Sequence, residues 1–113
     1  MIIVYGIKNC DTVKKACKWL TENNLDYRFH DFRKDGLTQS KIKKWASQVE
    51  WEILLNRRGT TWRKLSEDQK TNINKSNAIK LMTDQPTLIK RPVIEHNNEI
   101  IVGFSAETFQ QKL

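Results

Sequence analysis

Hydrophobic and polar positions predict a strand, a helix and a second strand in the first third of the chain. Residues 2–5 form a short apolar run, typical of a strand buried on both faces. From Asp11 onward, apolar residues recur at i, i+3, i+4 and i+7, which predicts a helix with one buried face. These positions are Val13, Ala16, Cys17 and Leu20. Apolar and polar residues then alternate over 25–29, as in a second strand, and Asp35-Gly36 predicts a turn.

The middle of the sequence carries helical patterns. The same helical spacing recurs at Ile42, Trp45, Ala46 and Val49. The stretch "WEILLNRRGTTW" predicts a short helical piece interrupted at Gly59. Ser66, with Gln69 three residues later, has the form of a capping box that opens another helix. Residues 78–82 predict one more short helix, which Pro86 follows.

The last third returns to strand patterns. Residues 92–95 and Glu99–Val102 are apolar strands that flank "HNN", where Asn97-Asn98 suits a tight hairpin. Ser105 is placed to cap a final helix, with Phe109 facing inward.

The order of these elements predicts the fold class. Two strands joined through a helix are expected to be parallel neighbours, whereas the hairpin adds antiparallel strands. The economical solution is an α/β fold with a mixed four-stranded sheet and helices on its faces. This is a thioredoxin-like core, enlarged by an all-helical insertion. We therefore expect a single domain over 1–113, with its core at about 1–36 and 86–113 and the insertion at about 37–85.

Composition places the chain among ordinary globular proteins. The chain has 113 residues, 38% of them hydrophobic, and four Trp, which suits one domain with a modest core. We expect neither a secretory signal nor contact with a membrane, because the apolar runs are far too short. Two cysteines do not make a disulfide framework. We therefore expect free thiols and a cytoplasmic location.

Charge gives a weaker indication of partners. The formal net charge is +7, and the basic residues occur as dispersed pairs rather than as one block. This pattern favours a solvated surface that attracts small anions. It makes nucleic acid or an acidic protein the weaker alternative.

Cys10 is the main candidate for chemistry, because it falls where a strand has ended and a helix is about to begin. The first turn of a helix has unbonded N–H groups and a partial positive charge, which stabilise a thiolate. Lys8 and Lys14 are expected to add to this effect. Such surroundings lower the pKa of a cysteine and make it a nucleophile. The alternative is a small residue that merely fits the turn.

Cys17 has a different expected role. It belongs to the apolar stripe of the predicted helix, so we expect it to be a core residue. Seven residues of helix span about 10 Å, whereas a disulfide requires Cα atoms within about 7 Å. The residue three positions after Cys10 is Val13 rather than a second cysteine. An external thiol such as glutathione would therefore have to complete a redox cycle.

The remaining candidates have ordinary structural explanations. His30 and His96 lack Cys or carboxylate neighbours at metal-ligand spacing, so no metal site is predicted. Trp45, Trp51 and Trp62 are expected to form the core of the insertion rather than to stack on bases.

Five motifs together resemble the ArsC/Spx family and, within it, the small bacterial branch called YffB. They are "YGIKNCDTVKKA", "YRFHDFRKDGL", "LLNRRGTTWRKL", "IKRPVI" and "VGFS", so the resemblance runs essentially from end to end. It implies a thioredoxin-like fold with an inserted helical subdomain and a single reactive cysteine at Cys10. For the YffB branch it also implies a glutathione-dependent thiol reductase, with glutathione as co-substrate and no metal.

The resemblance also implies a set of site residues around the catalytic candidate Cys10. The substrate-binding candidates are Lys8, Asn9, Thr12, Arg57, Arg91 and Pro92. In thioredoxin-like proteins a cis-proline at the place of Pro92 lies beside the reactive cysteine and leaves the preceding backbone free to pair with a peptide-like ligand. This place in the fold raises the cis form of the Arg91–Pro92 bond well above its base rate of about 5–6% of X–Pro bonds, but the sequence alone does not decide between cis and trans.

Arsenate reductases of this family surround their cysteine with three arginines, which this chain matches incompletely. Arg91 matches the arginine before the cis-proline. The second falls on Asn56 in an ungapped comparison, with Arg57 one residue later, and the third falls on Phe104. The reductases also carry C-G-T-S-R where this chain has C-D-T-V-K. These departures favour reduction of a disulfide or a glutathione mixed disulfide over reduction of arsenate.

Two alternative functions follow from the same resemblance. One is an arsenate reductase coupled to glutathione or glutaredoxin. The other is a non-enzymatic, Spx-like regulator that binds RNA polymerase. Spx proteins use a C-x-x-C redox switch, which Val13 removes from this chain. A redox-independent interaction protein is nevertheless compatible with the positive charge.

Overall fold

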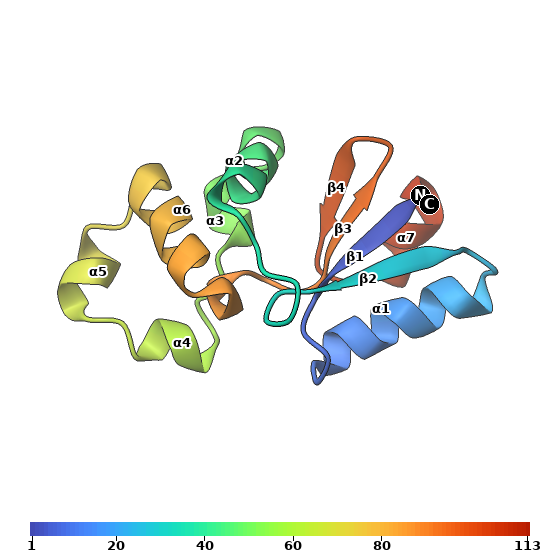
Figure 1. The fold of residues 1–113 in the computed structure, drawn as a ribbon, viewed down its shortest axis with the longest axis horizontal. Coiled ribbons are helices and arrows are strands. Elements are labelled where there is room, and N and C mark those ends of the chain that lie inside the picture. The colour runs from blue at the N-terminus through green and yellow to red at the C-terminus, as the bar shows by residue number, and fades with distance from the viewer. The chain divides into compact units, whose positions relative to one another are not determined.

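The computed structural model describes residues 1–113 and divides into two compact units (Figure 1). The first comprises Met1–Gly36 and Arg91–Leu113 and is called the sheet unit below. The second comprises Leu37–Lys90 and is called the helical unit. The chain therefore leaves the sheet unit after Gly36 and returns to it at Arg91.

The sheet unit is built on one four-stranded sheet with the order β2-β1-β3-β4. Its strands are β1 (Ile2–Gly6), β2 (Tyr27–Asp31), β3 (Val93–His96) and β4 (Glu99–Val102). β1 pairs with β2 in parallel, and the pairs β1–β3 and β3–β4 are antiparallel. A parallel β-α-β unit followed by a hairpin and a helix is a thioredoxin-like arrangement. The predicted α/β fold with a mixed sheet is therefore confirmed.

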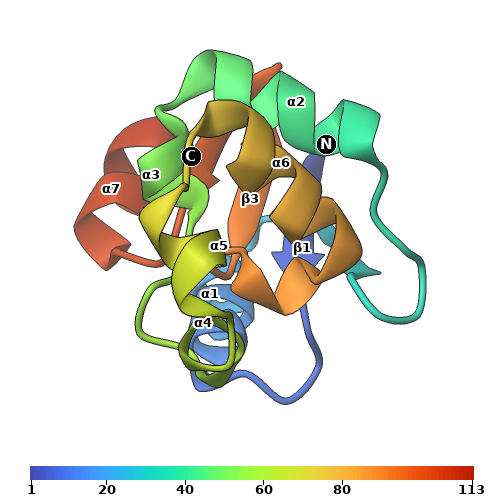
Figure 2. The ribbon, with the colours of Figure 1, turned by 90° about the vertical axis from the view of Figure 1, so that its left-hand side faces the viewer.

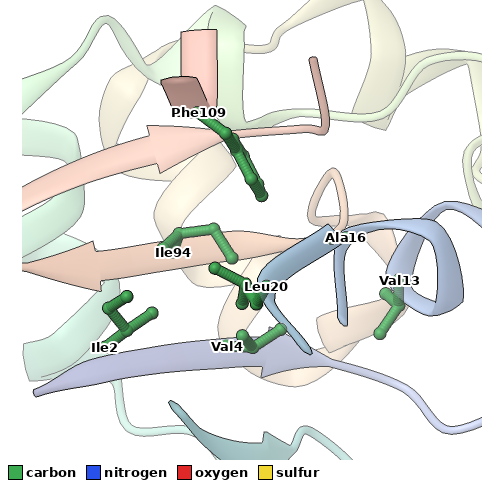
Figure 3. Close-up of a cluster of buried hydrophobic side chains, with 7 residues drawn as sticks. All are labelled: Ile2, Val4, Val13, Ala16, Leu20, Ile94 and Phe109. Atoms are coloured by element: carbon green, nitrogen blue, oxygen red, sulfur yellow. The ribbon is translucent and has the colours of Figure 1, made fainter. Parts of the chain in front are cut away.

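Two helices of the sheet unit, α1 (Asp11–Glu22) and α7 (Ala106–Lys112), pack with the strands around one hydrophobic core (Figure 3). Strand side chains alternate between the two faces, so Ile2 and Val4 of β1 reach this core from the same face as Ile94 of β3. Its buried members are Ile2, Val4, Val13, Ala16, Leu20, Ile94 and Phe109. Complete burial of one such aliphatic side chain stabilises the fold by roughly 1.5–3 kcal/mol.

The turn between β3 and β4 has the conformation that its sequence predicts. Asn97 and Asn98 have φ values of 52° and 66°, and both central residues of a type I′ turn require positive φ. His96 and Glu99 pair on either side of them. Asn24, at φ 57°, follows the end of α1 in the same left-handed region. The predicted hairpin is confirmed.

The helical unit consists of short helices (Figure 2). They are α2 (Gln39–Gln48), α3 (Trp51–Leu54), α4 (Thr60–Arg63), α5 (Glu67–Thr71), α6 (Lys75–Asp84) and the 3₁₀ turn η1 (Pro86–Leu88). The largest fully buried side chains here are Ile42, Trp45, Leu54, Leu55, Met82, Leu88 and Ile89. No helix of the chain is both long enough and apolar enough to cross a membrane.

Side-chain oxygens cap the N-termini of four helices. In α2, α5, α6 and α7, the residue before the helix accepts a hydrogen bond from the third helical N–H group. The capping residues are Thr38, Ser66, Asn74 and Ser105. Ser66 and Gln69 form the complete predicted capping box. Caps of this kind each contribute about 1 kcal/mol.

The return to the sheet unit comes later than the predicted boundary near residue 86. Leu55 and Ile89 form an isolated antiparallel bridge, and the N–H of Lys90 donates to the carbonyl of Leu54 at 2.7 Å. Because of these long-range contacts, the segment up to Lys90 belongs to the helical unit. No local sequence pattern indicates this boundary.

Two other expectations for the helical unit need correction. The helix predicted over 78–82 runs from Lys75 to Asp84, because its first turn is polar and exposed and therefore carries no apolar pattern. Of the three tryptophans expected in the core, only Trp45 is fully buried. Trp51 and Trp62 are half-buried, and the guanidinium of Arg57 lies 5.5 Å from the Trp62 ring centroid.

Candidate active site

Cys10 is the N-cap residue of α1, as its place in the sequence predicts. Its backbone is extended, with φ −109° and ψ 123°, and its carbonyl accepts the first helical hydrogen bond from the N–H of Lys14 at 3.0 Å. β1 ends at Gly6, so a short loop of three residues carries the chain to this position. The side chain is half-buried and packs against the sheet-unit core. Cys10 therefore lies at the mouth of the sheet rather than inside it.

The surroundings of Cys10 favour its thiolate. Partial burial alone raises the pKa of the Cys10 thiol, but several groups outweigh this effect. The backbone N–H of Val13, the Arg91 side chain and the N–H of Thr12 donate toward the sulfur, and the positive charge of Arg91 adds to them, so that the pKa falls below its ordinary value. The Cys10 side chain forms no regular cap hydrogen bond, and the interaction of these donors with the sulfur strengthens when the thiol is ionised.

Arg91 reaches the cysteine from a distant part of the sequence because of the sheet pairing. Val93 of β3 pairs with Tyr5 of β1 in antiparallel register, so Arg91 lies beside the loop that follows β1. The Arg91–Pro92 bond is cis, which decides a question that the sequence left open. The carbonyl of Pro92 accepts a hydrogen bond from the N–H of Gly103 at 2.7 Å, which ties this segment to the end of β4.

The other predicted substrate-binding residues divide into two groups. Lys8 and Asn9 are exposed in the loop before Cys10, and Thr12 contributes its N–H group. Neither Lys8 nor Lys14 is among the groups that shift the Cys10 pKa, so the expectation that these lysines stabilise the thiolate is not supported. Arg57 belongs to the helical unit, and its substrate-binding role stays a prediction.

Cys17 packs against the sheet-unit core, as predicted, but is less deeply buried than predicted. It is half-buried, and its thiol forms a hydrogen bond with the side chain of Tyr27 on β2. Burial raises the pKa of the Cys17 thiol, although the Tyr27 hydroxyl partly opposes this shift. The helical pattern identified the correct face of α1 but not the depth, because Cys17 lies at the flank of that face. The raised pKa makes Cys17 a poor nucleophile.

Phe104, which falls at the position of the third arginine of arsenate reductases, has an apolar role. Its ring packs edge-on against Phe109, with 5.0 Å between ring centroids. It is partly buried against the sheet-unit core. This position therefore contributes packing and no positive charge.

The two histidines have structural contacts. Nε2 of His30 lies 2.6 Å from the carbonyl oxygen of Gly36, and the His30 ring lies 4.8 Å from the Tyr5 ring. Nε2 of His96 lies 3.2 Å from the side-chain amide of Asn97 in the hairpin. No group of three His, Cys, Asp or Glu side chains is placed to hold a metal ion.

Sequence reasoning missed the contribution of Val13. It considered Val13 as an apolar position of the helix and as the place of an absent second cysteine, but not as a hydrogen-bond donor to the sulfur. The structure gives its backbone N–H the largest pKa-lowering effect on Cys10. The signal was available, because the third helical N–H is the usual donor to an N-cap side chain.

Comparison with known proteins identifies the family of this chain. The model of the ArsC family matches residues 5–112. The chain belongs to the ArsC family. A solved structure named as a YffB protein is 42% identical, with 98% of this chain and 97% of that chain covered and a TM-score of 0.95. The predicted resemblance to the YffB branch is thereby confirmed.

Two further relatives of this ArsC-family chain have different descriptions. A protein from Brucella melitensis, described as related to arsenate reductase, is 45% identical over 97% of this chain and 92% of its own, with a TM-score of 0.80. The global transcriptional regulator Spx of Lactiplantibacillus plantarum is 24% identical over 100% of this chain and 86% of its own length.

Proposed function

We propose that this ArsC-family protein is a thiol reductase that uses Cys10 as its nucleophile and glutathione as the reducing co-substrate. The observation that carries the proposal is the set of donors around the Cys10 sulfur. Two N–H groups of the first helical turn and the Arg91 side chain lower its pKa despite partial burial. A lowered pKa increases the ionised fraction of the thiol, and the thiolate is the nucleophilic form.

The proposed reaction begins with a mixed disulfide between glutathione and a substrate thiol. The Cys10 thiolate attacks the glutathionyl sulfur, a new S–S bond forms and the old one breaks. The electron pair of the broken S–S bond goes to the substrate sulfur, which then takes a proton from solvent. The thiolate of a second glutathione then attacks the glutathionyl sulfur on Cys10, which forms oxidised glutathione and returns Cys10 as a thiolate.

An external thiol is needed because the chain offers no internal one. Cys17 lies two turns along the same helix, and its pKa is raised by burial. Val13 occupies the position where a dithiol site has its second cysteine, and its side chain is buried. Glutathione supplies the missing thiol, and its carboxylates suit the guanidinium of Arg91.

Two features argue against arsenate as the substrate. The position of the third arginine is held by Phe104, whose ring packs on Phe109. The second arginine position falls on Asn56, whose Oδ1 accepts a hydrogen bond from the N–H of Arg58. An arsenate oxyanion would therefore meet fewer fixed cations than in the arsenate reductases that the sequence resembles.

A non-enzymatic regulator that binds RNA polymerase is the second candidate function, and the full-length match to Spx favours it. A pull-down of RNA polymerase with the wild-type protein and with the Cys10→Ser variant distinguishes the two candidate functions. Polymerase binding that does not depend on Cys10, together with no thiol turnover, would support the regulator.

Turnover of a glutathionylated peptide tests the enzyme directly. Glutathione and glutathione reductase are supplied, and NADPH oxidation is followed. We expect Cys10→Ser to fall to the uncatalysed background and Cys17→Ser to keep most of the activity. Without free glutathione, the mass of the wild-type protein should increase by one glutathionyl group at Cys10. Equal turnover by Cys10→Ser would refute the proposal.

A further inference from the structure

Gly6, the last residue of β1, lies so close to the first turn of α1 that a residue with a side chain would not fit at this position. A Cβ atom at Gly6 would lie 2.7 Å from Cγ2 and 3.4 Å from Cγ1 of Val13. Contacts under 3.0 Å force one of the two atoms to move. Gly6 has an ordinary negative φ, so its missing side chain matters for space and not for backbone conformation.

The site against which Val13 packs is rigid. Gly6 pairs with Asp31 at the end of the parallel ladder, and its carbonyl accepts a hydrogen bond from the N–H of Phe32 at 2.8 Å. Val13 is itself only 3% exposed and belongs to the sheet-unit core (Figure 3). A Cβ at Gly6 would therefore be accommodated mainly by movement of the first turn of α1.

Movement of this turn affects the Cys10 sulfur because Val13 contacts both Gly6 and Cys10. The Val13 side chain packs on Gly6, and the Val13 backbone N–H donates toward the Cys10 sulfur. The strength of a hydrogen bond falls steeply with distance and angle. A small displacement of Val13 therefore weakens its interaction with the thiolate.

We propose that Gly6 is a positioning residue for Cys10: its lack of a side chain lets Val13 pack directly on the end of β1 and thereby holds the first turn of α1 under the cysteine sulfur. Gly6 touches neither the substrate nor the sulfur in this role. It acts through Val13. The inference concerns the site of the proposed function, but it can be tested without any turnover.

The test measures the rate of Cys10 alkylation by iodoacetamide between pH 5 and 10, in a Cys17→Ser background. We expect Gly6→Ala to shift the pH profile toward higher pH and to slow alkylation at pH 7 several-fold. In the double variant Gly6→Ala/Val13→Ala the clashing methyl groups are gone. Its profile should return to that of Val13→Ala alone.

A control separates positioning from general loss of stability. Leu20→Ala removes a fully buried side chain from the other end of α1, so it should lower the melting temperature and leave the pH profile unchanged. An unchanged profile in Gly6→Ala overturns the proposal, and so does a double variant that keeps the shifted profile. If Gly6→Ala does not fold, recovery of a folded double variant with the Val13→Ala profile supports the proposal, and failure to recover overturns it.

Discussion

Two helices of the sheet unit begin with the same geometry but with different atoms. α7 begins after Ser105, whose hydroxyl oxygen accepts the N–H of Thr108 at 3.3 Å. α1 begins after Cys10, and the N–H of Val13, at the equivalent third helical position, donates toward the sulfur. An oxygen caps a helix at any ordinary pH, whereas sulfur becomes a good acceptor only as a thiolate. The comparison shows how one atom converts a structural cap into a site that favours negative charge.

The largest expected effect compares Cys10 with the other cysteine of the same helix. At pH 7, Cys10 should be alkylated on the order of tenfold or more faster than Cys17, because the thiolate is the reactive form. The pKa of Cys10 is lowered by its donors, and that of Cys17 is raised by burial. The rates can be measured separately in Cys17→Ser and Cys10→Ser by mass spectrometry. Equal rates would remove the distinction between the two thiols.

Substitution of Arg91 should make the start of α1 more like that of α7. Arg91→Gln removes the positive charge beside Cys10, so the pKa of Cys10 should rise and alkylation at pH 7 should slow by roughly several-fold. Arg91→Lys keeps the positive charge but loses the planar guanidinium group, so it should raise the pKa of Cys10 by less. The pH profile of alkylation measures both changes. If Arg91→Gln leaves the pH profile unchanged, the lowering of the Cys10 pKa comes from the helix N–H groups alone.

Loss of the oxygen cap should have a moderate effect on stability alone. Ser105→Ala removes the acceptor of the Thr108 N–H and should lower the free energy of unfolding by about 1 kcal/mol. Urea denaturation at pH 6 and at pH 9 should give the same loss, since the serine hydroxyl does not titrate there. A loss that varies with pH would mean that another group takes part in this cap.

The smallest expected effect is the pH dependence of stability, and it should have opposite signs at the two cysteines. The folded-state pKa of Cys10 is lowered, so its stabilising contribution is present above the unfolded pKa, about 8.5, and is lost as pH falls through the folded pKa. The pKa of Cys17 is raised, so its contribution is present below the unfolded pKa and is lost as pH rises through the folded pKa. Urea denaturation of wild type, Cys10→Ser and Cys17→Ser from pH 6 to 10 tests both signs. Parallel curves for all three proteins would contradict this prediction.

Local chemistry in the sequence predicted much of the fold. The asparagine pair of the hairpin, the Ser66 box and the Ser105 cap act within a few residues, and the structure contains all of them. Short apolar runs and one alternating stretch likewise predicted the strands that form the mixed sheet.

Long-range contacts account for what the sequence did not predict. Lys8 was expected to stabilise the thiolate because it is near in sequence, but the charge that acts there is that of Arg91, which the sheet pairing brings close and which only the family resemblance had assigned to the site. The end of the helical unit depends on the bridge between Leu55 and Ile89. The depth of Cys17 depends on its position beside Tyr27. Periodicity identifies a face of a helix, but only the assembled neighbours determine burial and charge.

The N–H groups at the start of α1 have a consequence for the second half of the proposed cycle. When glutathione attacks the mixed disulfide on Cys10, the Cys10 sulfur departs with the electron pair, and a thiol of low pKa is the better leaving group. The donors that prepare the sulfur for attack therefore also assist its release. One helix terminus would speed both the loading and the unloading of the same atom.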